Sequence, residues 1–203
     1  MGGEPSAPTA KRVAVQTAVL EATEALLAEG TSYPELKIER IATRAGISRT
    51  AFYFYFKDKR ELLMRLTEEV TDELFAAADL WFSGPSDQAL DEMRDALHQI
   101  AALYDVHGTL LRAIVEVSTY DEEFAQFWRG LTQRFADAST RRIEDEQKSG
   151  RAPEFDAAAA SFALTWMTER TFYQHFVQGF ERERVVDAVH GIWVRAIYGR
   201  VDV

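Results

Sequence analysis

Apolar residues recur at helical spacing along nearly the whole chain. No segment alternates apolar and polar residues with the period of two that is typical of a strand. Nine helices are predicted on this spacing, with Gly, Pro and capping residues between them. In chain order they cover residues 10–29, 36–45, 48–54, 58–82, 86–106, 109–117, 121–150, 153–179 and 182–198. The pattern therefore predicts an all-α protein.

Local signals fix several of these helix ends. Gly46 is suited to the left-handed conformation that ends a helix, and Ser48 is suited to cap the next one. Asp58, followed three residues later by Glu61, is a capping box for the helix over 58–82. We expect Gly108 to be a joint between two separate helices. The short pair of helices around Gly46 is typical of a helix-turn-helix.

An unbroken run of five aromatic residues, 52–56, follows that turn. Five consecutive rings are too many for one buried face of a helix, so some must be exposed. We expect Phe52 and Phe56 to pack inward. Cations flank the run, namely Arg44, Arg49, Lys57 and Lys59. Exposed rings among cations on a short helix are typical of the reading helix of a DNA-binding motif.

Composition excludes several other classes of protein. The 203 residues include no Cys, which excludes disulfides and thiolate metal sites. No apolar run approaches the roughly 18 residues that a membrane span needs, so we expect no membrane association. The first residues lack the apolar core of a signal peptide, and a cytoplasmic location is the expectation. Nothing in the sequence calls for a cofactor.

The net charge of −10 argues against DNA binding until its distribution is considered. Residues 1–60 carry nine Lys and Arg against seven Asp and Glu, whereas residues 61–203 carry 14 against 26. An acidic body would repel the duplex, so only the N-terminal part is expected to contact it. We predict a disordered tail over 1–9, a helix-turn-helix domain over 10–57, and a helical ligand-binding and dimerisation domain over 58–203.

The candidate DNA contacts are small or polar residues on and around the two short helices. Arg49 is suited to donate to a guanine edge, and Thr50 and Ala51 to touch thymine methyl groups. Tyrosine, lysine and hydroxyl side chains are suited to phosphate oxygens. The full set is Lys37, Arg40, Thr43, Ser48, Arg49, Thr50, Ala51, Tyr53, Tyr55, Lys57 and Lys59.

The predicted helices of the body carry aromatic stripes at helical spacing. The simplest interpretation is that these stripes fill one core. Bulky rings with a few polar groups also line apolar ligand sites. Glu169 lies on an otherwise apolar stripe with Trp166 and Tyr173, and a buried carboxylate needs a partner. A structural ion pair and a ligand contact both remain open for Glu169.

Two stretches resemble a known family. They are Ala45-Gly46-Ile47-Ser48 followed by Phe52-Tyr53-x-Tyr55-Phe56-x-x-Lys59, and Glu169-Arg170-Thr171 with His190-Gly191-Ile192-Trp193-Val194 and Ile197-Tyr198-Gly199. The first resembles the signature of the TetR family of transcriptional regulators, and the second is similar to its EthR-like branch. Thr50 and Ala51 depart from the family, where Gly or Pro and then Thr are common. We therefore expect a changed base preference.

The resemblance implies a largely apolar ligand channel along the helices over 86–106, 121–150, 153–179 and 182–198. The matching positions, with Trp166 from the same stripe, are Met93, Ile100, Tyr104, Trp128, Phe135, Thr165, Trp166, Thr168, Glu169, Tyr173 and Trp193. Amide side chains are usual in the family where Thr165 and Thr168 stand, and Trp is usual where Met93 and Phe135 stand. The ligand therefore need not be the relative's.

The resemblance also implies an operator-binding homodimer, paired through the last two helices, that a small apolar or amphipathic effector releases from a palindromic site. Repression is the family's usual output. Two alternatives stay open. One is a DNA-binding regulator without ligand control. The other is a di-iron enzyme, because Asp95 and His98, and again Asp187 and His190, stand three residues apart.

Overall fold

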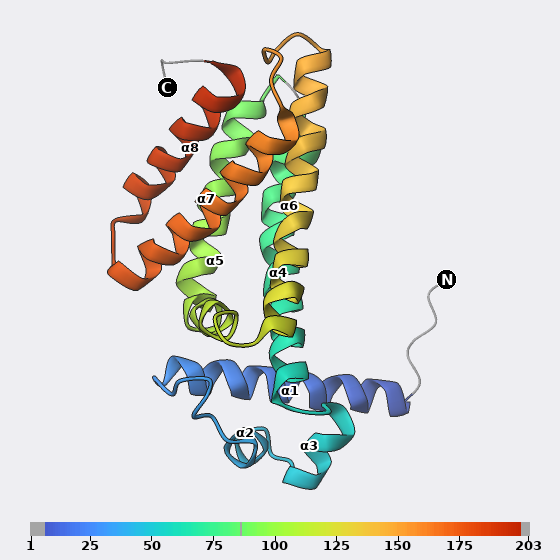
Figure 1. Ribbon diagram of the computed structural model, residues 1–203. Helices are drawn as coiled ribbons and strands as arrows, with labels where there is room; N and C mark the ends of the chain where they lie inside the picture. The colour runs from blue at the N-terminus through green and yellow to red at the C-terminus, as the bar shows by residue number, and fades with distance from the viewer. Residues whose placement is uncertain (1–6, 86, 200–203) are drawn as a thin grey trace.

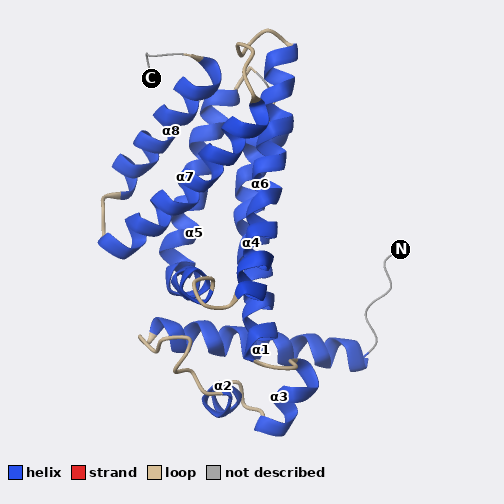
Figure 2. Ribbon diagram, viewed as in Figure 1, coloured by secondary structure: helices blue, strands red, loops and turns tan. Residues whose placement is uncertain are grey.

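The computed structural model describes residues 7–85 and 87–199, and within these ranges the protein is entirely helical. Figure 1 shows the order of the elements and Figure 2 shows that loops alone connect them. The helices are α1 (Ala7–Ala28), α2 (Ile38–Arg44), α3 (Arg49–Tyr55), α4 (Lys59–Ser83), α5 (Ala89–Val117), α6 (Glu122–Lys148), α7 (Ala157–Gln178) and α8 (Arg182–Tyr198). The predicted all-α class is confirmed.

Helices α1 to α3 lie together at one end of the molecule and form what we call the head (Figure 1). Helix α4 begins beside the head and runs into the body, which α5 to α8 complete. The C-terminal end of the described chain lies at the opposite end from the head. One continuous cluster of buried apolar residues joins the two parts, because it contains Val19 and Leu26 of the head as well as Leu66 and Trp193 of the body.

The head is a small three-helix unit packed around aromatic residues. Phe52 and Phe56 are fully buried, with ring centroids 5.4 Å apart, which confirms that both pack inward. Ile41 and Ala42 of α2 and Val19 of α1 close the same core. The other rings of the run divide as expected, since half of Tyr53 remains exposed.

The turn between α2 and α3 forms as its sequence predicts. Gly46 has φ of +71°, the left-handed region that favours glycine. The N–H of Gly46 donates to the carbonyl of Thr43 and the N–H of Ile47 to that of Ala42, which is a Schellman ending of α2. The hydroxyl of Ser48 then accepts from the N–H of Ala51 at 3.0 Å and caps α3. The angle between the two short helices is thus set by local hydrogen bonds.

The prediction of nine helices was wrong by one, because residues 89–117 form the single helix α5. No Pro interrupts this stretch, and a glycine within a helix costs only about 1 kcal/mol relative to alanine. Gly108 has a packing role instead. A Cβ atom on Gly108 would overlap the ring of Phe176 on α7. The ribbon of α5 changes direction in its last third, where it passes above the head (Figure 1).

Other boundaries differ by a few residues. Helix α1 begins at Ala7, three residues before the predicted start, and residues 1–6 of the predicted tail lie outside the described residues. Ser86, the predicted cap of the next helix, also lies outside them, and α5 follows Gln88. Asp58 caps α4 as predicted. Across the described ranges, every helix lacks the length of apolar sequence that a bilayer crossing requires.

Candidate DNA-reading surface and ligand cavity

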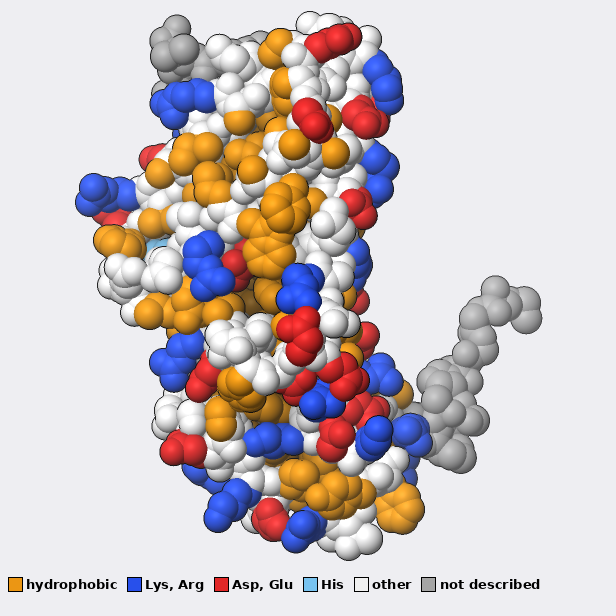
Figure 3. Space-filling model, viewed as in Figure 1, with side chains coloured by type: hydrophobic (Ala, Val, Ile, Leu, Met, Phe, Trp, Pro, Cys, Tyr) orange, Lys and Arg blue, Asp and Glu red, His pale blue; other side chains and the backbone are white. Residues whose placement is uncertain are grey.

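The outer surface of the head presents most of the predicted DNA contacts. Exposed side chains follow α2, the turn and α3, and they are Lys37, Arg40, Thr43, Ser48, Arg49, Thr50, Tyr53 and Lys57. Ala51 and Tyr55 are half-buried, and the ring of Tyr55 lies 5.8 Å from the guanidinium of Arg12. Figure 3 shows Lys and Arg side chains beside hydrophobic ones on this end of the molecule. The surface therefore combines cations with exposed rings.

Several cations of the head are already paired with carboxylates. Arg40 and Arg44 both reach Glu29, the residue that follows α1, at 3.4 Å and 2.8 Å. Arg49 lies 2.7 Å from Glu39, and both side chains are more than half exposed. Such exposed pairs are worth little in water, so a phosphate or a base edge can replace the carboxylate at small cost. Among the described residues, Lys37 and Lys57 form no ion pair.

The ammonium of Lys59 is bound by the loop before α2. Its ammonium donates to the backbone carbonyls of Tyr33 at 2.7 Å and of Pro34 and Leu36 at 3.1 Å. These bonds use all three N–H donors of the ammonium, and burial lowers the pKa of Lys59. The Tyr33 hydroxyl in turn donates to the carbonyl of Lys59. Lys59 thus fastens the loop before α2, and its phosphate contact stays a prediction.

Phe54 is a further residue of this surface that the sequence reasoning missed. It is 75% exposed, more than Tyr53 at 46%. An exposed phenylalanine has no polar atom to hydrate, so a large exposed ring suggests contact with another molecule. The signal was present in the aromatic run, which required some rings to face outward, but the spacing alone did not say which.

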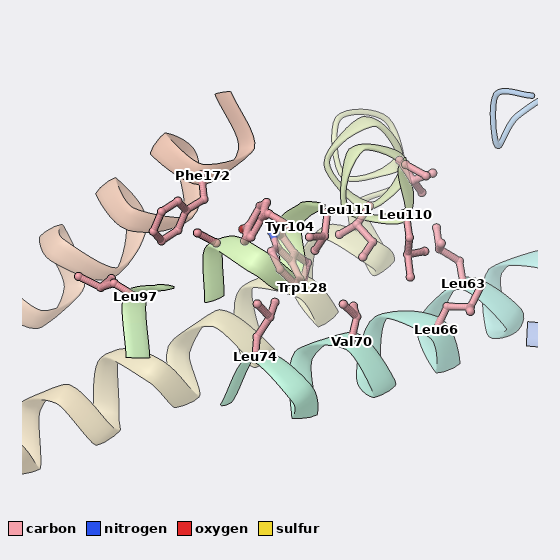
Figure 4. Packing of buried hydrophobic residues seen from close by; sticks show 14 of the residues in the cluster. Leu63, Leu66, Val70, Leu74, Leu97, Tyr104, Leu110, Leu111, Trp128 and Phe172 are labelled. Atoms are coloured by element: carbon pink, nitrogen blue, oxygen red, sulfur yellow. The ribbon is translucent and has the colours of Figure 1, made fainter. Parts of the chain in front are cut away.

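The body holds an apolar cavity lined by residues of α4, α5, α6, α7 and α8. About 100 Å³ of it is available to the centre of a water molecule. Figure 4 shows Leu74, Tyr104, Trp128 and Phe172, which come from four different helices, gathered around this region. Nine of the predicted ligand residues line the cavity, namely Met93, Ile100, Tyr104, Trp128, Phe135, Thr165, Thr168, Glu169 and Trp193.

Two predicted ligand residues do not line it. Trp166 packs edge-on against the exposed ring of Phe162, with centroids 6.4 Å apart. Tyr173 lies under the guanidinium of Arg170 at 5.1 Å. Both stand on α7 with Glu169, but a helical stripe is wider than the part of it that meets the cavity. Trp166 and Tyr173 therefore lie outside the cavity lining, and their contact with a ligand stays a prediction.

The sequence reasoning missed the contribution of α4. The lining residues that were not predicted are Leu74, Ala78, Trp81, Phe82, Ala96, Leu97, Thr132, Ser139 and Phe172. The first four belong to α4, the helix that also starts beside the head. Leu74 and Trp81 stand at helical spacing on α4, but spacing does not distinguish a core stripe from a cavity wall. Phe172 on α7 is fully buried.

Few polar groups reach the cavity, and one of them is a carboxylate. The indole N–H of Trp193 donates to the hydroxyl of Thr168 at 2.8 Å. Glu169 has a side chain only 8% exposed, and its Oε2 atom has no hydrogen-bond partner among the described residues. Burial raises the pKa of Glu169, and burial together with the nearby Glu169 charge raises that of Tyr104. The cavity is thus apolar with one electronegative spot.

Two sets of ion pairs connect the head end of the molecule to the body. Arg60, near the start of α4, pairs with Asp121 at 2.7 Å and Glu123 at 2.6 Å at the start of α6. His107 of α5 lies 2.8 Å from Glu24 of α1 and 3.4 Å from Glu73 of α4. The hydrogen bond to Glu24 is the main cause that raises the pKa of His107.

Helices α7 and α8 and the loop between them present exposed apolar side chains to the outside. Phe162 and Val177 on α7, Phe180 in the loop and Ile192 on α8 are each between 43% and 56% exposed. Figure 3 shows hydrophobic side chains gathered over these two helices. The small residues Ala158 and Ala159 on the same helix pair are also exposed. These exposed apolar side chains form a candidate contact surface for another molecule.

The residues of the di-iron alternative are not brought together. His190 faces the carbonyl of Leu90 at 3.1 Å, and His98 lies 3.7 Å from Glu183. Within the part of the chain that the structure describes, no three His, Asp or Glu side chains form a group that would hold a metal ion.

An all-helical chain with an exposed helix-turn-helix at one end and a cavity in its body has the architecture of a helix-turn-helix transcriptional regulator. Comparison with known proteins gives the family. The profile described as "Bacterial regulatory proteins, tetR family" matches residues 19–66, and that of "Transcriptional regulator EthR, C-terminal domain" matches residues 93–199. The chain belongs to the TetR family of transcriptional regulators, in the EthR-like branch.

Relatives with curated names agree. The HTH-type transcriptional regulator EthR of Mycolicibacterium smegmatis is 30% identical over 194 residues, which is 92% of this chain and 88% of the relative. EthR of Mycobacterium tuberculosis strain H37Rv is 29% identical over 189 residues, 91% of this chain and 87% of the relative. These relatives are DNA-binding regulators, and the protein is a regulator and not an enzyme.

Solved structures share the fold at lower identity. FadR of Bacillus subtilis, solved with stearoyl-CoA, has a TM-score of 0.74 at 16% identity, covering 91% of this chain and 98% of that one. SmeT, the repressor of the Stenotrophomonas maltophilia multidrug efflux pump SmeDEF, has a TM-score of 0.71 at 19% identity and covers 89% of each chain.

Proposed function

We propose that the protein is a repressor that binds a palindromic operator as a homodimer and that a small apolar or amphipathic molecule releases. The observation that carries the proposal is the path of α4. This helix starts at Lys59, beside the reading helix α3, and farther along it supplies Leu74 and Trp81 to the wall of the cavity. One rigid element therefore touches both the proposed DNA surface and the proposed ligand site.

DNA recognition is assigned to the head, over residues 10–57. Helix α3 enters the major groove with Arg49 and Thr50 at its first turn, where base edges are within reach. Tyr53, Lys37 and Lys57 hold the phosphates on either side. The acidic body over 58–203 stays away from the duplex. Because the operator is chromosomal, we assign the protein to the cytoplasm.

Dimerisation is assigned to α7 and α8. A single head covers too small a surface for strong specificity, and two heads about 34–36 Å apart read one face of the duplex. The exposed Phe162, Val177 and Ile192 lie on this helix pair. Pairing them about a two-fold axis buries apolar surface, which is the main driving force of association. A second copy of the chain is the expected partner.

Ligand control is assigned to the cavity. A ligand shifts a two-state balance only by its different affinity for the two states. The cavity is narrow, so an occupant larger than the space must move α4 relative to α5 and α6. A tilt of α4 changes the distance between the two heads of a dimer, and the dimer then no longer fits its operator. The stearoyl-CoA of the FadR structure supports an occupant with a long apolar part.

Fluorescence anisotropy tests this proposal with labelled DNA from upstream of the protein's own gene, measured at two salt concentrations. We expect tight, salt-sensitive binding that Arg49→Ala weakens by tenfold or more, about 1.4 kcal/mol. The matched control is Arg129→Ala, an exposed arginine of the body paired with Glu122 at 2.7 Å. Equal affinity of the wild type and Arg49→Ala would contradict the assigned reading helix. DNA binding that no cavity ligand weakens would favour the alternative of a regulator without ligand control.

A further inference from the structure

Glu169 is a carboxylate buried in an apolar cavity without a full partner. Its side chain is only 8% exposed, and it lines the cavity between α5, α6 and α7. Its Oε2 atom accepts no hydrogen bond from the described residues. A carboxylate removed from water without a compensating partner is costly to the folded state. Such a group in a binding cavity therefore either destabilises the folded protein or serves to recognise a ligand.

The neighbouring cation does not remove the problem. The Nε atom of Arg170 lies 3.7 Å from Oε2, which is beyond hydrogen-bonding distance. The Arg170 side chain is 52% exposed, and its guanidinium lies over the ring of Tyr173 outside the cavity. Arg170 therefore screens Glu169 from the solvent side only. Oε2, the carboxylate atom nearest Arg170, therefore still lacks a hydrogen-bond partner among the described residues.

The walls beside this carboxylate are aromatic. Tyr104 lies close enough to Glu169 for the charge of the carboxylate to affect the tyrosine, and its ring is 5.7 Å from that of Phe172. Trp128 and Trp193 line the same cavity. The faces of such rings attract cations, and tryptophan does so most strongly. A carboxylate and ring faces together complement a positive group and repel a negative one.

We propose that the effector is an amphipathic cation, an apolar molecule with one protonated nitrogen that the carboxylate of Glu169 binds. This inference rests on the proposed function, because it names the chemical class of the ligand for the same cavity. The apolar part of the effector fills the space between Met93, Phe135 and Leu74. The protonated nitrogen donates to Glu169 in a charge-assisted hydrogen bond, which is about twice as strong as a neutral one.

Three matched probes with one chain length test the charge requirement, namely decylamine, decanol and decanoate, each below the concentration at which it forms micelles. A primary amine is protonated at pH 7, as a lysine side chain is. Calorimetry and the fluorescence of the cavity tryptophans measure the dissociation constants for the full-length protein. We expect decylamine to bind at least tenfold more tightly than decanol, and decanoate to bind most weakly.

Two variants assign the preference to Glu169. Glu169→Gln keeps the shape and removes the charge, and we expect the ratio of decanol to decylamine dissociation constants to fall to within about twofold of one. Glu144→Gln, an exposed carboxylate on α6, removes the same charge from the body and keeps the wild-type ratio. Circular dichroism and melting temperatures establish that both variants fold.

The outcomes separate the two proposals. Equal binding of amine and alcohol, or an amine preference that survives in Glu169→Gln, overturns the cation inference and leaves the ligand cavity standing. A Glu169-dependent amine preference with unchanged operator affinity supports the cation inference and contradicts ligand-controlled release. Absence of binding by all three probes to the wild type overturns both.

Discussion

The head and the body of this protein treat their buried polar groups differently. In the described side chains of the head, the buried Thr23 hydroxyl donates to the carbonyl of Val19 at 2.7 Å. Every buried side-chain nitrogen or oxygen that lacks a protein hydrogen-bond partner, over the side chains that the structure describes, belongs to α4–α8. The cavity lies in that same half. In the head, the described buried polar atoms are paired and the candidate binding side chains lie on the surface. In the body, unpaired buried polar atoms and the cavity lie inside.

This difference matches the two tasks. A surface that must fit one fixed target, the major groove, gains from a rigid core that holds Arg49 and Tyr53 in place. A site that must respond to a small molecule gains from space and from groups whose interactions are completed by the ligand. The charge distribution follows the same division, since the acidic residues are concentrated after residue 60.

The largest expected effect concerns packing. Ala42 in the head core is 1% exposed, and Ala96 lines the cavity. We expect Ala42→Leu to lower the free energy of unfolding by about 1–3 kcal/mol, because a filled core has no room for three more carbons. Ala96→Leu should stay within about 0.5 kcal/mol of the wild type, because its side chain enters the cavity. Urea denaturation measures both, and equal costs would remove the contrast between the two cores.

A smaller effect separates the two lysines that follow the reading helix. Lys59→Met leaves three backbone carbonyls without their donor, so we expect a loss of about 1–2 kcal/mol in the free energy of unfolding. Lys57→Met should leave stability unchanged and reduce the salt dependence of DNA binding by about one phosphate contact. Denaturation and anisotropy at several salt concentrations check the pair. The reverse result would restore Lys59 as a phosphate contact.

The smallest effect concerns the connection between the two regions. His107 on α5 is titratable near neutral pH, and the charged groups that face it are Glu24 on α1 and Glu73 on α4. Because the folded state raises the pKa of His107, its contribution is fully present below the unfolded value of about 6.5 and is lost as pH rises through the folded value. We expect it to be about 1 kcal/mol or less. His107→Gln should remove this pH dependence of unfolding, and a wild-type pH profile in the variant would exclude the contribution.

Much of the head was predictable because its signals are local. Gly46, Ser48 and Asp58 form hydrogen bonds with residues only a few positions away. Their positions in the sequence therefore mark the end of α2 and the starts of α3 and α4. The capping box was nearly right as well. Glu61 accepts from the N–H of Lys57 at 2.7 Å, one residue before the expected donor.

The errors share one physical cause, which is contact between residues far apart in the chain. Gly108 was predicted to break a helix. The local sequence does not reveal that the ring of Phe176 occupies the space beside this glycine. The sequence likewise cannot show that the ammonium of Lys59 donates to three carbonyls of the loop before α2. It puts Trp166 on the stripe of Glu169 without showing that Trp166 lies outside the cavity lining, because spacing defines a stripe and not its neighbours.

The sequence by itself determined the helical class, the helix-turn-helix and the separation of charge between the two ends, because periodicity, local capping and the order of charges can be read along the chain. The resemblance to the TetR family supplied half of the residues that line the cavity. Only the tertiary structure decided that α4 is a wall of the cavity, that Glu169 lines it with an Oε2 atom that lacks a partner among the described residues, and that Lys59 fastens a loop. Those facts depend on which side chains of different helices contact one another. Burial and charge pairing determine these contacts only once the whole chain has packed.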